Sequence, residues 1–480
     1  MKKLLLQLAL VLLPFAVFAQ SEGPLYKDFE KGVKSPLHVY KFNDHLYVLS
    51  QPIDDEHREL AAVDDKMQLL WRINIPGISY STAKFKDHIL AIGMTVKKNL
   101  TTINGYLIDE KNGNVLLQKV IYEEHREGGF YLLSLSSEDG SFFKILARGS
   151  GSDKWVSTSS KEFHETKDLA LIDVNEKLEA SASKLDIPEG NYIGETHNKQ
   201  GDIFLFFYQE DNTIKVVKYD AGKTTPGKPI IQDIELHDKD DLKYTNEEFV
   251  ASNQDRNVVY FALTHRNNGK ERALTVSKFD FNTNTGKTTH VVLDKDHIKN
   301  LEKSFVPLDK DMRNPSIGRG ADMSIRHVEE YNGTLLVALS DPNMGEYQIG
   351  ASNAAPNGAN TAHYLGARAI IINAFDQNLK PKFEQVLPVA YASVKILNEA
   401  YHADGSNYYI LATNNDAVAY SQLDLNTGKF LKFKIFHPEK WHTIDSDALW
   451  FKDSFIIPYR HPVGIVNTQK HNVDLQLNTY

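Results

Sequence analysis

A short β-hairpin pattern that recurs along the whole chain limits what this sequence can fold into. In residues 417–436 (AVAYSQLDLNTGKFLKFKIF), Leu431, Phe433 and Ile435 alternate with two lysines, which is typical of a strand with one buried face. The preceding turn, DLNTG, supplies Asp and Asn side chains that bond nearby backbone N–H groups, and a Gly that tolerates positive φ. This segment is therefore predicted to form two antiparallel strands joined by a tight loop.

This hairpin contains a recurring motif, called the Asp key below: two mostly apolar residues, then Asp, then a polar turn. Seven copies of the motif occur in the chain, together with an eighth, degenerate copy. Successive copies are 43 to 96 residues apart. Their Asp or Asn residues are Asp64, Asp109, Asp173, Asp220, Asp280, Asp376, Asp424 and Asn467. A second hairpin pattern precedes each copy, so that one unit holds four strands. Four antiparallel strands repeated every ~40–50 residues are the signature of a β-propeller blade.

Eight such units predict an all-β fold, a single β-propeller of eight four-stranded blades. The units are expected to begin near His38, Tyr80, Phe130, Asn191, Thr245, Asp322, Ala392 and Trp441. The last unit is expected to hold all of its own strands, so no closure strand shared between the termini is predicted. Seven blades plus an extra hairpin is the alternative; tandem β-sandwiches would not require the same key eight times. One helix is expected over 294–305, capped by Asp294 or Asp296.

The first residues have the pattern of a secretory signal. Lys2 and Lys3 precede an apolar run, and cleavage is expected after Ala19. The predicted division of the chain is a signal peptide at 1–19, an N-terminal leader at 20–36 and the β-propeller at 37–480. An uncleaved membrane anchor is the alternative, although the apolar run is short for a span. The expectation is an exported protein, soluble in the periplasm or outside the cell, with no transmembrane anchor after cleavage.

Composition and missing motifs exclude several classes of function. The chain has no cysteine, which excludes disulfides, thiol chemistry and a lipoprotein anchor. The net charge is −9 and the charges are scattered, which argues against nucleic-acid binding. Because no nucleophile elbow, P-loop, dinucleotide fingerprint or helical zinc pair occurs, no cofactor and no metal are predicted. The Asp-keyed turns lack the distal Glu of an EF-type calcium loop and are interpreted as turn stabilisers.

A second acidic turn lies in SSEDGSFF, residues 136–143. It is similar to the sialidase Asp-box, Ser-x-Asp-x-Gly-x-Thr-Trp, but Asp139 and Gly140 are adjacent and no Trp follows. It is therefore not assigned to that motif.

The geometry of a blade indicates which face of the ring carries the function. In an up-and-down blade with strands A to D, the A–B and C–D turns share one end, and the B–C and D–A loops share the other. The Asp-keyed C–D turns are short, whereas three long excursions fall at the opposite end: 148–167, 295–321 and 341–368. Long insertions in compact folds are usually functional, so this long-loop face is predicted to bind the ligand or partner.

The candidate ligand-binding residues lie in or beside these excursions. Arg313 and Arg319 are within RNPSIGRG, where a guanidinium could hold a carboxylate or phosphate bidentately. Arg326 and His327 lie on the innermost strand of unit six and are expected to point into the channel. The complete candidate set is Trp155, Arg313, Arg319, Arg326, His327, Tyr347, His363 and Tyr364. A mobile loop is the alternative for 341–368, and a solvated loop for RNPSIGRG.

Units such as LIDEKNGN, KFDFNTNTGK and QLDLNTGK resemble those of quinoprotein-type and related exported bacterial β-propeller repeat proteins. The resemblance covers the predicted propeller and implies its fold. The four tryptophans do not recur once per blade and the vicinal cysteines of quinoprotein dehydrogenases are missing, so the resemblance implies no cofactor.

Two classes of function remain. The first is a non-enzymatic binding or assembly scaffold of the bacterial cell envelope, with a protein or glycan partner on the long-loop face, because a propeller offers a broad rigid surface without a catalytic motif. The alternative is a glycan-directed hydrolase or lyase with its site at the channel mouth, and small-ligand sensing is a third hypothesis. Two carboxylates about 5–10 Å apart in a cleft would favour the glycosidase. Catalytic residues are not assigned, because in a propeller they come from different blades.

Overall fold

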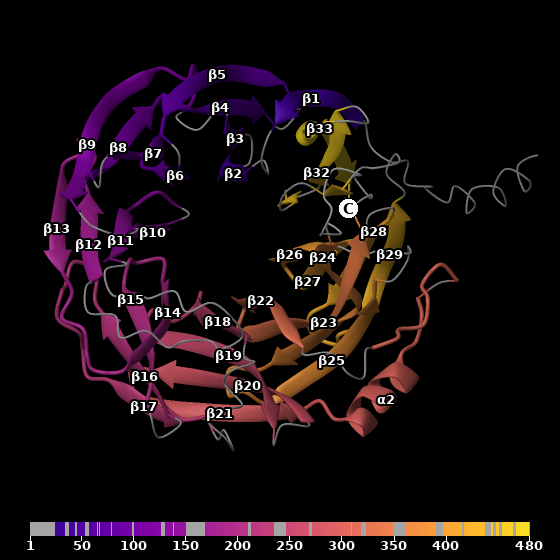
Figure 1. Cartoon of the computed structure of the whole chain (residues 1–480). Helices are drawn as coiled ribbons and strands as arrows, with labels where there is room; N and C mark the ends of the chain where they lie inside the picture. Colours follow the sequence, from indigo (N-terminus) through magenta and orange to yellow (C-terminus); the bar gives the residue numbers. More distant parts are fainter. Residues whose placement is uncertain are drawn as a thin grey trace, which may run out of the picture.

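The structure, a computed structural model, describes residues 25–479 except for 34–37, 44–45, 53–56, 65, 67, 78, 98–99, 126–129, 138, 150–168, 210–212, 235–245, 268–270, 309, 318–322, 349–360, 390–396, 415–416, 437–442, 445–447, 451–453 and 464–466. The described residues form eight antiparallel sheets arranged in a ring around a central opening (Figure 1). The sheets are called blades one to eight in chain order. The predicted fold, an eight-bladed β-propeller, is confirmed.

In blades one to seven, four consecutive strands run from the innermost to the outermost position (Figure 1). Blades one and two consist of β2 (His38–Asn43), β3 (Leu46–Pro52), β4 (His57–Asp64), β5 (Leu69–Pro76), β6 (Ser79–Phe85), β7 (His88–Lys97), β8 (Leu100–Ile108) and β9 (Val115–His125). Blades three and four consist of β10 (Phe130–Ser136), β11 (Phe143–Gly149), β12 (Leu169–Val174), β13 (Ala180–Lys184), β14 (Asn191–His197), β15 (Ile203–Tyr208), β16 (Thr213–Tyr219) and β17 (Ile230–Asp233).

The next three blades follow the same order. Blades five and six consist of β18 (Asn246–Ala251), β19 (Val258–Asn267), β20 (Glu271–Asp280), β21 (Thr285–Val292), β22 (Ser324–Tyr331), β23 (Thr334–Gln348), β24 (Thr361–Phe375) and β25 (Pro381–Pro388). Blade seven consists of β26 (Leu397–Asp404), β27 (Asn407–Asn414), β28 (Ala417–Asp424) and β29 (Phe430–Phe436). The blades begin within a few residues of the predicted unit starts.

Blade eight joins strands from both ends of the chain. Two short inner strands, β30 (Thr443–Ile444) and β31 (Leu449–Trp450), pair with β32 (Ser454–Val463), which pairs with β33 (Asn467–Thr479). The outer strand is β1 (Leu25–Val33), which pairs antiparallel with β33. The expectation that the last unit holds all of its own strands is therefore wrong, and part of the segment expected to be a leader forms a strand of the ring. Without β1, β33 would present an unpaired edge.

The apolar core lies between neighbouring blades, because each blade is covered on both faces. All six residues of β15 (IFLFFY) are buried, as expected for a strand with no solvent-facing side. Between blades four and five, Phe206 packs on Phe249 with ring centroids 4.5 Å apart, and Phe249 stacks on Phe261 at 5.4 Å. The outer strands alternate instead, as in β5, where Trp71 and Ile75 are buried.

The Asp-keyed turns are stabilised by their own side chains. Asp109, Asp376 and Asp424 each accept a hydrogen bond from the backbone N–H two residues on, at 2.7, 2.8 and 2.8 Å. The interpretation as turn stabilisers is confirmed at these positions. In blade three Asn175 has this role, because Asp173 lies within β12 and forms an ion pair with Lys144 at 2.8 Å.

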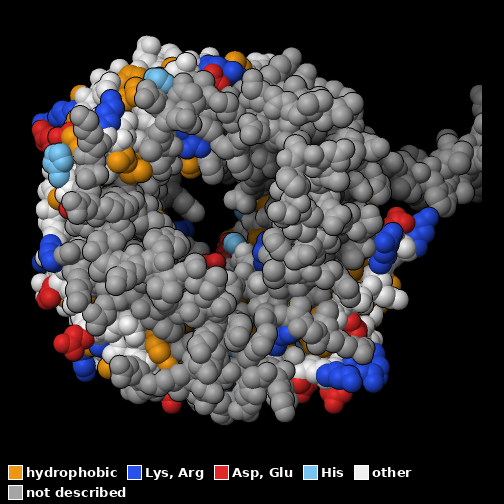
Figure 2. All heavy atoms as spheres, viewed as in Figure 1, with side chains coloured by type: hydrophobic (Ala, Val, Ile, Leu, Met, Phe, Trp, Pro, Cys, Tyr) orange, Lys and Arg blue, Asp and Glu red, His pale blue; other side chains and the backbone are white. Residues whose placement is uncertain are grey.

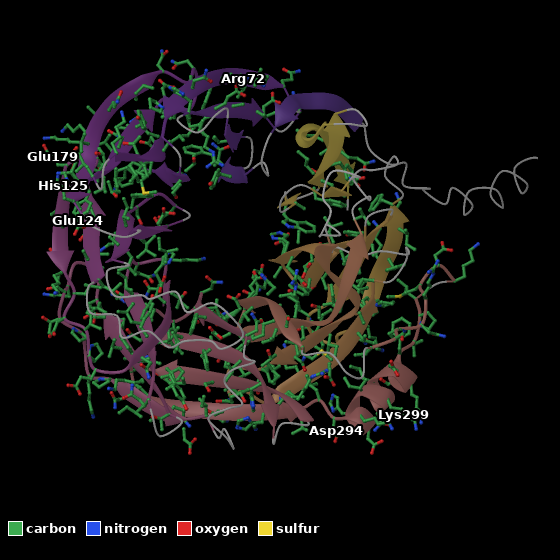
Figure 3. The ribbon with its side chains drawn as sticks, in the orientation of Figure 1. Arg72, Glu124, His125, Glu179, Asp294 and Lys299 are labelled. Carbon is green, nitrogen blue, oxygen red and sulfur yellow. The ribbon has the colours of Figure 1, made fainter. Side chains whose placement is uncertain are left out.

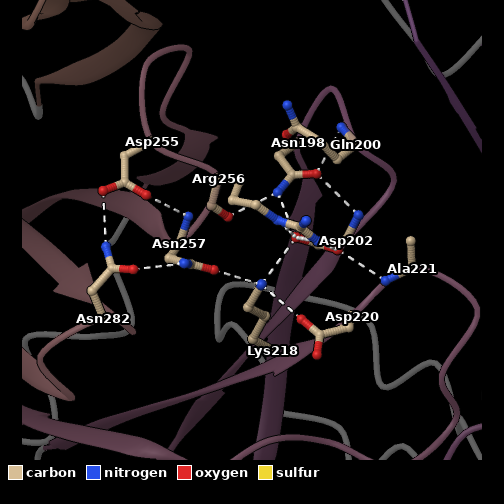
Figure 4. A network of polar contacts seen from close by, with 10 residues as sticks. All are labelled: Asn198, Gln200, Asp202, Lys218, Asp220, Ala221, Asp255, Arg256, Asn257 and Asn282. Atoms are coloured by element: carbon tan, nitrogen blue, oxygen red, sulfur yellow. Dashed lines mark hydrogen bonds and ion pairs between the residues drawn. The ribbon is translucent and has the colours of Figure 1, made fainter.

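A buried carboxylate joins blades four and five at the short-turn end of the ring (Figure 4). The Asp202 side chain is fully buried and lies 2.7 Å from Nη2 of Arg256, which belongs to the A–B turn of blade five, and 3.0 Å from Nζ of Lys218. Burial by itself raises the pKa of Asp202, but hydrogen bonds from Arg256, Asn198 and Lys218 outweigh it and lower the pKa to about 2. The carboxylate is therefore ionised over the whole ordinary pH range.

A similar joint connects blades five and six. Glu330 on β22 is buried and accepts hydrogen bonds from the Ser252 hydroxyl at 3.2 Å and from the Asn253 backbone at 2.6 Å. Its other oxygen accepts the Gly333 backbone N–H at 2.7 Å. Short turns of adjacent blades are thus held together by carboxylates that replace their lost hydration with protein donors.

The helix α2 (Lys295–Ser304) begins at Asp294, whose carboxylate accepts the His297 backbone N–H at 2.7 Å, so the first of the two predicted caps is confirmed. The helix lies outside β25, with Asp294 and Lys299 at the outer edge of the ring (Figures 1 and 3). Phe305, just after the helix, packs edge-on against Phe430 of β29 at 6.4 Å. This part of the 295–321 excursion therefore braces the outside of blades six and seven. No helix in the described ranges has the length and apolarity of a membrane-crossing segment.

Candidate functional site

The centre of the ring is open on the face shown in Figure 2, and acidic, basic and histidine side chains lie at the rim of the opening. The innermost strands of blades five, six and seven are β18, β22 and β26. Each runs from the long-loop end of the ring to the short-turn end. Glu248, Arg326, His327 and Glu399 occupy the third or fourth position of these strands, and Tyr401 the fifth position of β26. These five residues, called the polar cluster below, therefore lie near the middle of the strands that border the channel.

A β-bulge on β22 sets the direction of two of these side chains. Ile325 pairs with Leu339 and His327 with Ala338, so that Arg326 is an extra residue in the ladder. Neighbours on a regular strand point to opposite faces. At this bulge, however, Arg326 and His327 both contact side chains of β26 in the next blade.

Arg326 forms a bidentate ion pair with Glu399. Its Nη2 lies 3.0 Å from one carboxylate oxygen, and its Nε donates to the other. The Glu399 side chain is 4% exposed and that of Arg326 is 23% exposed. Burial lowers the pKa of Arg326, but the hydrogen bonds and charge of Glu399 outweigh it, so that the pKa is raised above its ordinary value. The guanidinium is therefore a permanent cation held in one orientation, partly open to solvent.

His327 is held by ring stacking. Its imidazole lies parallel to the Tyr401 ring, with centroids 4.7 Å apart and planes 5° apart, and Nε2 is 3.3 Å from a carboxylate oxygen of Glu329. Tyr401 in turn stacks on Tyr408 at 6.1 Å. Burial, and next the charge of Glu399, raise the pKa of Tyr401 well above its ordinary value. The Tyr401 phenol therefore stays protonated at physiological pH.

Glu248 on β18 is solvent-exposed, yet it belongs electrostatically to the same group. Desolvation by the surrounding protein raises its pKa, and the nearby His327 partly offsets this effect. A carboxyl group with a raised pKa beside a channel can donate as well as accept hydrogen bonds at mildly acidic pH.

The 341–368 excursion is not the loop that was expected. Its two ends continue β23 and β24 as paired strands, from Pro342 opposite Ala367 to Gln348 opposite Thr361. The ladder shifts register just before Pro342, since proline has no N–H to donate to it. Seven residues per strand extend beyond the sheet, which is a projection of about 20 Å on the long-loop face.

The structure places the predicted site residues in three groups. Arg326 and His327 are brought together in the polar cluster. Tyr347, His363 and Tyr364 lie on the projecting hairpin, where their backbones pair with those of Ala362, Glu346 and Gly345. Arg313 is exposed in the segment after α2, and Trp155 and Arg319 lie outside the described residues.

Sequence reasoning missed Glu248, Glu399 and Tyr401. The two residues of β26 lie on one face of NEAYHAD, and this period-two pattern was the available signal. No local motif links them to residues 326 and 327, because the contact crosses from one blade to the next. Over the residues that the structure describes, no group of three or more His, Asp or Glu side chains is placed to hold a metal ion.

Comparison with known proteins does not assign the chain to a family. No protein-family model and no curated protein matches the chain. Among solved structures, the chain is similar to the Dos1 propeller (10% identity, 97% of this chain and 96% of that chain, TM-score 0.46) and to an ulvan lyase, described as a polysaccharide lyase, bound to -[GlcA(1-4)Rha3S]- (11%, 96% and 96%, 0.44). It is also similar to the WD40 domain of SCAP from fission yeast (10%, 95% and 98%, 0.43). At these values the likenesses carry no argument about function.

Proposed function

We propose that this protein is a non-enzymatic binding scaffold of the bacterial cell envelope, which holds a protein or glycan partner on the long-loop face of the propeller. The observation that carries the proposal is the bulge on β22, which points Arg326 and His327 toward the same neighbouring blade. Both side chains are fixed before any partner arrives. Fixed donors lose little conformational entropy on binding, which favours recognition of oxygen-rich groups.

The protonation states in the polar cluster favour binding over catalysis. Arg326 is a permanent cation already paired with Glu399, and the Tyr401 phenol has a pKa raised well above its ordinary value. Neither group is a base near neutral pH. The projecting β23–β24 hairpin extends beyond the sheet at the long-loop end of blade six and adds backbone surface to that face.

One observation favours the alternative, a glycan-directed hydrolase or lyase at the channel mouth. Glu248 has a pKa raised by desolvation and lies close to His327, which is a pattern found in general acids. Glu248→Gln removes the acid with little change in shape. If the protein releases new reducing ends or unsaturated sugars from envelope polysaccharide, and Glu248→Gln abolishes this release, the enzyme hypothesis replaces the scaffold.

A crosslinking pull-down from envelope fractions tests the scaffold. The wild-type protein is compared with Arg326→Ala and His327→Ala, and with the matched controls Arg72→Ala and His125→Ala, both on outer strands (Figure 3). We expect one partner to be recovered with the wild type and the two controls and lost with the two cluster variants. Equal recovery with all five proteins contradicts binding at the polar cluster.

Export belongs to the same proposal. Removal of residues 1–19 would leave Gln20 as the first residue of the mature protein, a few residues before β1. N-terminal sequencing of the protein recovered from periplasmic and culture fractions tests this. A chain recovered only from the cytoplasm with Met1 intact contradicts it.

A further inference from the structure

A cavity of about 370 Å³ lies at the short-turn end of the ring. Its apolar part is formed by Phe85, Phe142 and Phe143. Its polar part comes from Asp173 near the end of β12, from the C–D turn of blade three (residues 175–179), and from Lys86 in the A–B turn of blade two. The site thus lies where the short turns of two neighbouring blades meet. This is the face opposite the long-loop face, which the sequence predicted to bind the ligand or partner.

One wall is the SSEDGSFF turn, which is fastened to blade two. The Gly140 carbonyl accepts the Lys86 backbone N–H at 2.8 Å. Gly140 has a φ of 75°, and an added Cβ there would lie 2.8 Å from the Lys86 nitrogen, so the close approach requires glycine. Within the turn, Asp139 accepts the Ser141 N–H at 2.9 Å, and the Ser137 and Ser141 hydroxyls are 3.0 Å apart. This wall is therefore preformed.

The opposite wall is equally defined. The Asn175 side-chain oxygen accepts the backbone N–H groups of Lys177 and Glu179, each at 2.9 Å. Its amide nitrogen donates to the Glu179 carboxylate at 2.9 Å. The turn that carries the polar groups is thus held in one conformation by a single side chain.

The charges of the cavity are largely balanced within the protein. Asp173 pairs with Lys144 at 2.8 Å, and Glu176 lies 3.6 Å from Lys86. Paired carboxylates create little demand for a cationic ligand, but their remaining lone pairs can still accept hydrogen bonds from hydroxyl groups. Phe142, half-buried and edge-on to His197 at 6.1 Å, adds an aromatic ring to the lining. Carboxylate acceptors and the second N–H of the Asn175 amide, beside an aromatic ring, suit a ligand with many hydroxyls and an apolar C–H face.

We infer that this cavity binds one neutral sugar unit, with the ring C–H groups against Phe142 and the hydroxyls bonded to Asp173, Asn175 and Glu176. The volume is at the low end of the range of small-molecule sites, roughly 300–1,000 Å³, which fits a single small unit rather than a long chain. The inference does not depend on the proposed function, because the cavity belongs to blades two and three and the polar cluster to blades five to seven.

Saturation-transfer NMR on the full chain tests the inference, with the methyl glycosides of glucose, galactose, mannose and rhamnose as probes. We expect at least one probe to receive saturation from the wild type. Phe142→Leu keeps apolar volume but removes the aromatic ring, and should weaken binding roughly threefold to tenfold. The Glu176 side chain is 69% exposed, so Glu176→Gln should weaken binding without affecting folding.

Two matched controls separate this site from the rest of the surface. Glu110→Gln changes the C–D turn of blade two. Phe281→Leu changes a partly buried aromatic residue in the C–D turn of blade five. Both controls should bind as the wild type does. Absence of transfer to all four probes overturns the inference, as does unchanged binding by Glu176→Gln together with Phe142→Leu. Thermal unfolding of each variant shows that the ring is intact.

Discussion

Arg256 of blade five donates to both oxygens of the Asp202 carboxylate of blade four, from Nε at 3.1 Å and from Nη2 at 2.7 and 2.9 Å. The Asp202 side chain is fully buried, whereas that of Arg256 is 48% exposed. The contact between the two blades therefore depends on one carboxylate whose hydration is replaced by hydrogen bonds from protein donors. Lys218, Asn198 and the backbone N–H of Ala221 also donate to this carboxylate (Figure 4).

Replacement of this carboxylate should destabilise the ring. Asp202→Asn keeps the shape but leaves Lys218, 8% exposed, without its buried counter-charge. Breaking a buried ion pair from one side costs about 3–5 kcal/mol, and we expect a loss of about 3 kcal/mol because Arg256 can turn to solvent. Chemical denaturation measures it. The control is Asp220→Asn, which also contacts Lys218 but is 63% exposed, and should cost less than ~1 kcal/mol. Equal losses for the two variants would contradict the buried joint.

The same carboxylate should give the ring an acid-sensitive component of stability. The pKa of Asp202 is about 2 in the folded chain, below the ordinary value of 3.8. A lowered pKa means that the stabilisation is complete above the unfolded pKa and is lost as the pH falls through 3.8 toward 2. The difference in unfolding free energy between wild type and Asp202→Asn should therefore be constant near neutral pH and shrink below about pH 4. A difference that grows on acidification would be inconsistent with this origin.

Removal of the closure strand should open blade eight. Deletion of residues 1–33 removes β1 and leaves the outer edge of β33 unpaired. Exposed edge strands pair with other chains, so we expect a lower unfolding midpoint together with dimers or larger species. Light scattering after size-exclusion chromatography and thermal unfolding measure both effects. Deletion of residues 1–24 alone is the control and should leave a stable single species; the same result for both deletions would show that β1 is dispensable.

The projecting β23–β24 hairpin should be separable from the ring. Among the described residues, 342–348 pair with 361–367 beyond Ser340, so replacing residues 342–367 with a two-residue Asn-Gly turn keeps the β23–β24 pairs from Leu335 to Ser340. We expect the unfolding midpoint to change little. Limited proteolysis of the intact chain should cut within 341–368 while the ring stays folded. Independent unfolding of two halves of the chain would argue against a single propeller.

The blades could be predicted from sequence because their signal is local. An Asp that accepts the N–H two residues on, as Asp109 and Asp376 do, stands between two strands, and the seven copies of the sequence motif give the period of the fold. The motif did not identify the turn-stabilising residue of blade three, which is Asn175. It also gave no signal for β1, which is not part of such a hairpin.

The candidate site could be predicted only in part, because it is assembled across blades. Arg326 and His327 were found from their place on an innermost strand. Glu399 and Tyr401 lie more than 70 residues further along, and what joins them is a bulge whose register shift leaves no mark in the local sequence. The length of the excursions pointed to the long-loop face, but it gave no indication of the cavity between blades two and three.

Pairing of β1 with β33 places Leu25 opposite Gln476. Blades one to seven are each built from consecutive strands, so during synthesis each can form soon after its last strand has emerged. Blade eight cannot, because its outer strand β1 precedes the strands of the other seven blades in the chain and its partner β33 follows them. The ring therefore closes only after β33 has been made, and until then the chain keeps two open edges that proteases and chaperones can recognise.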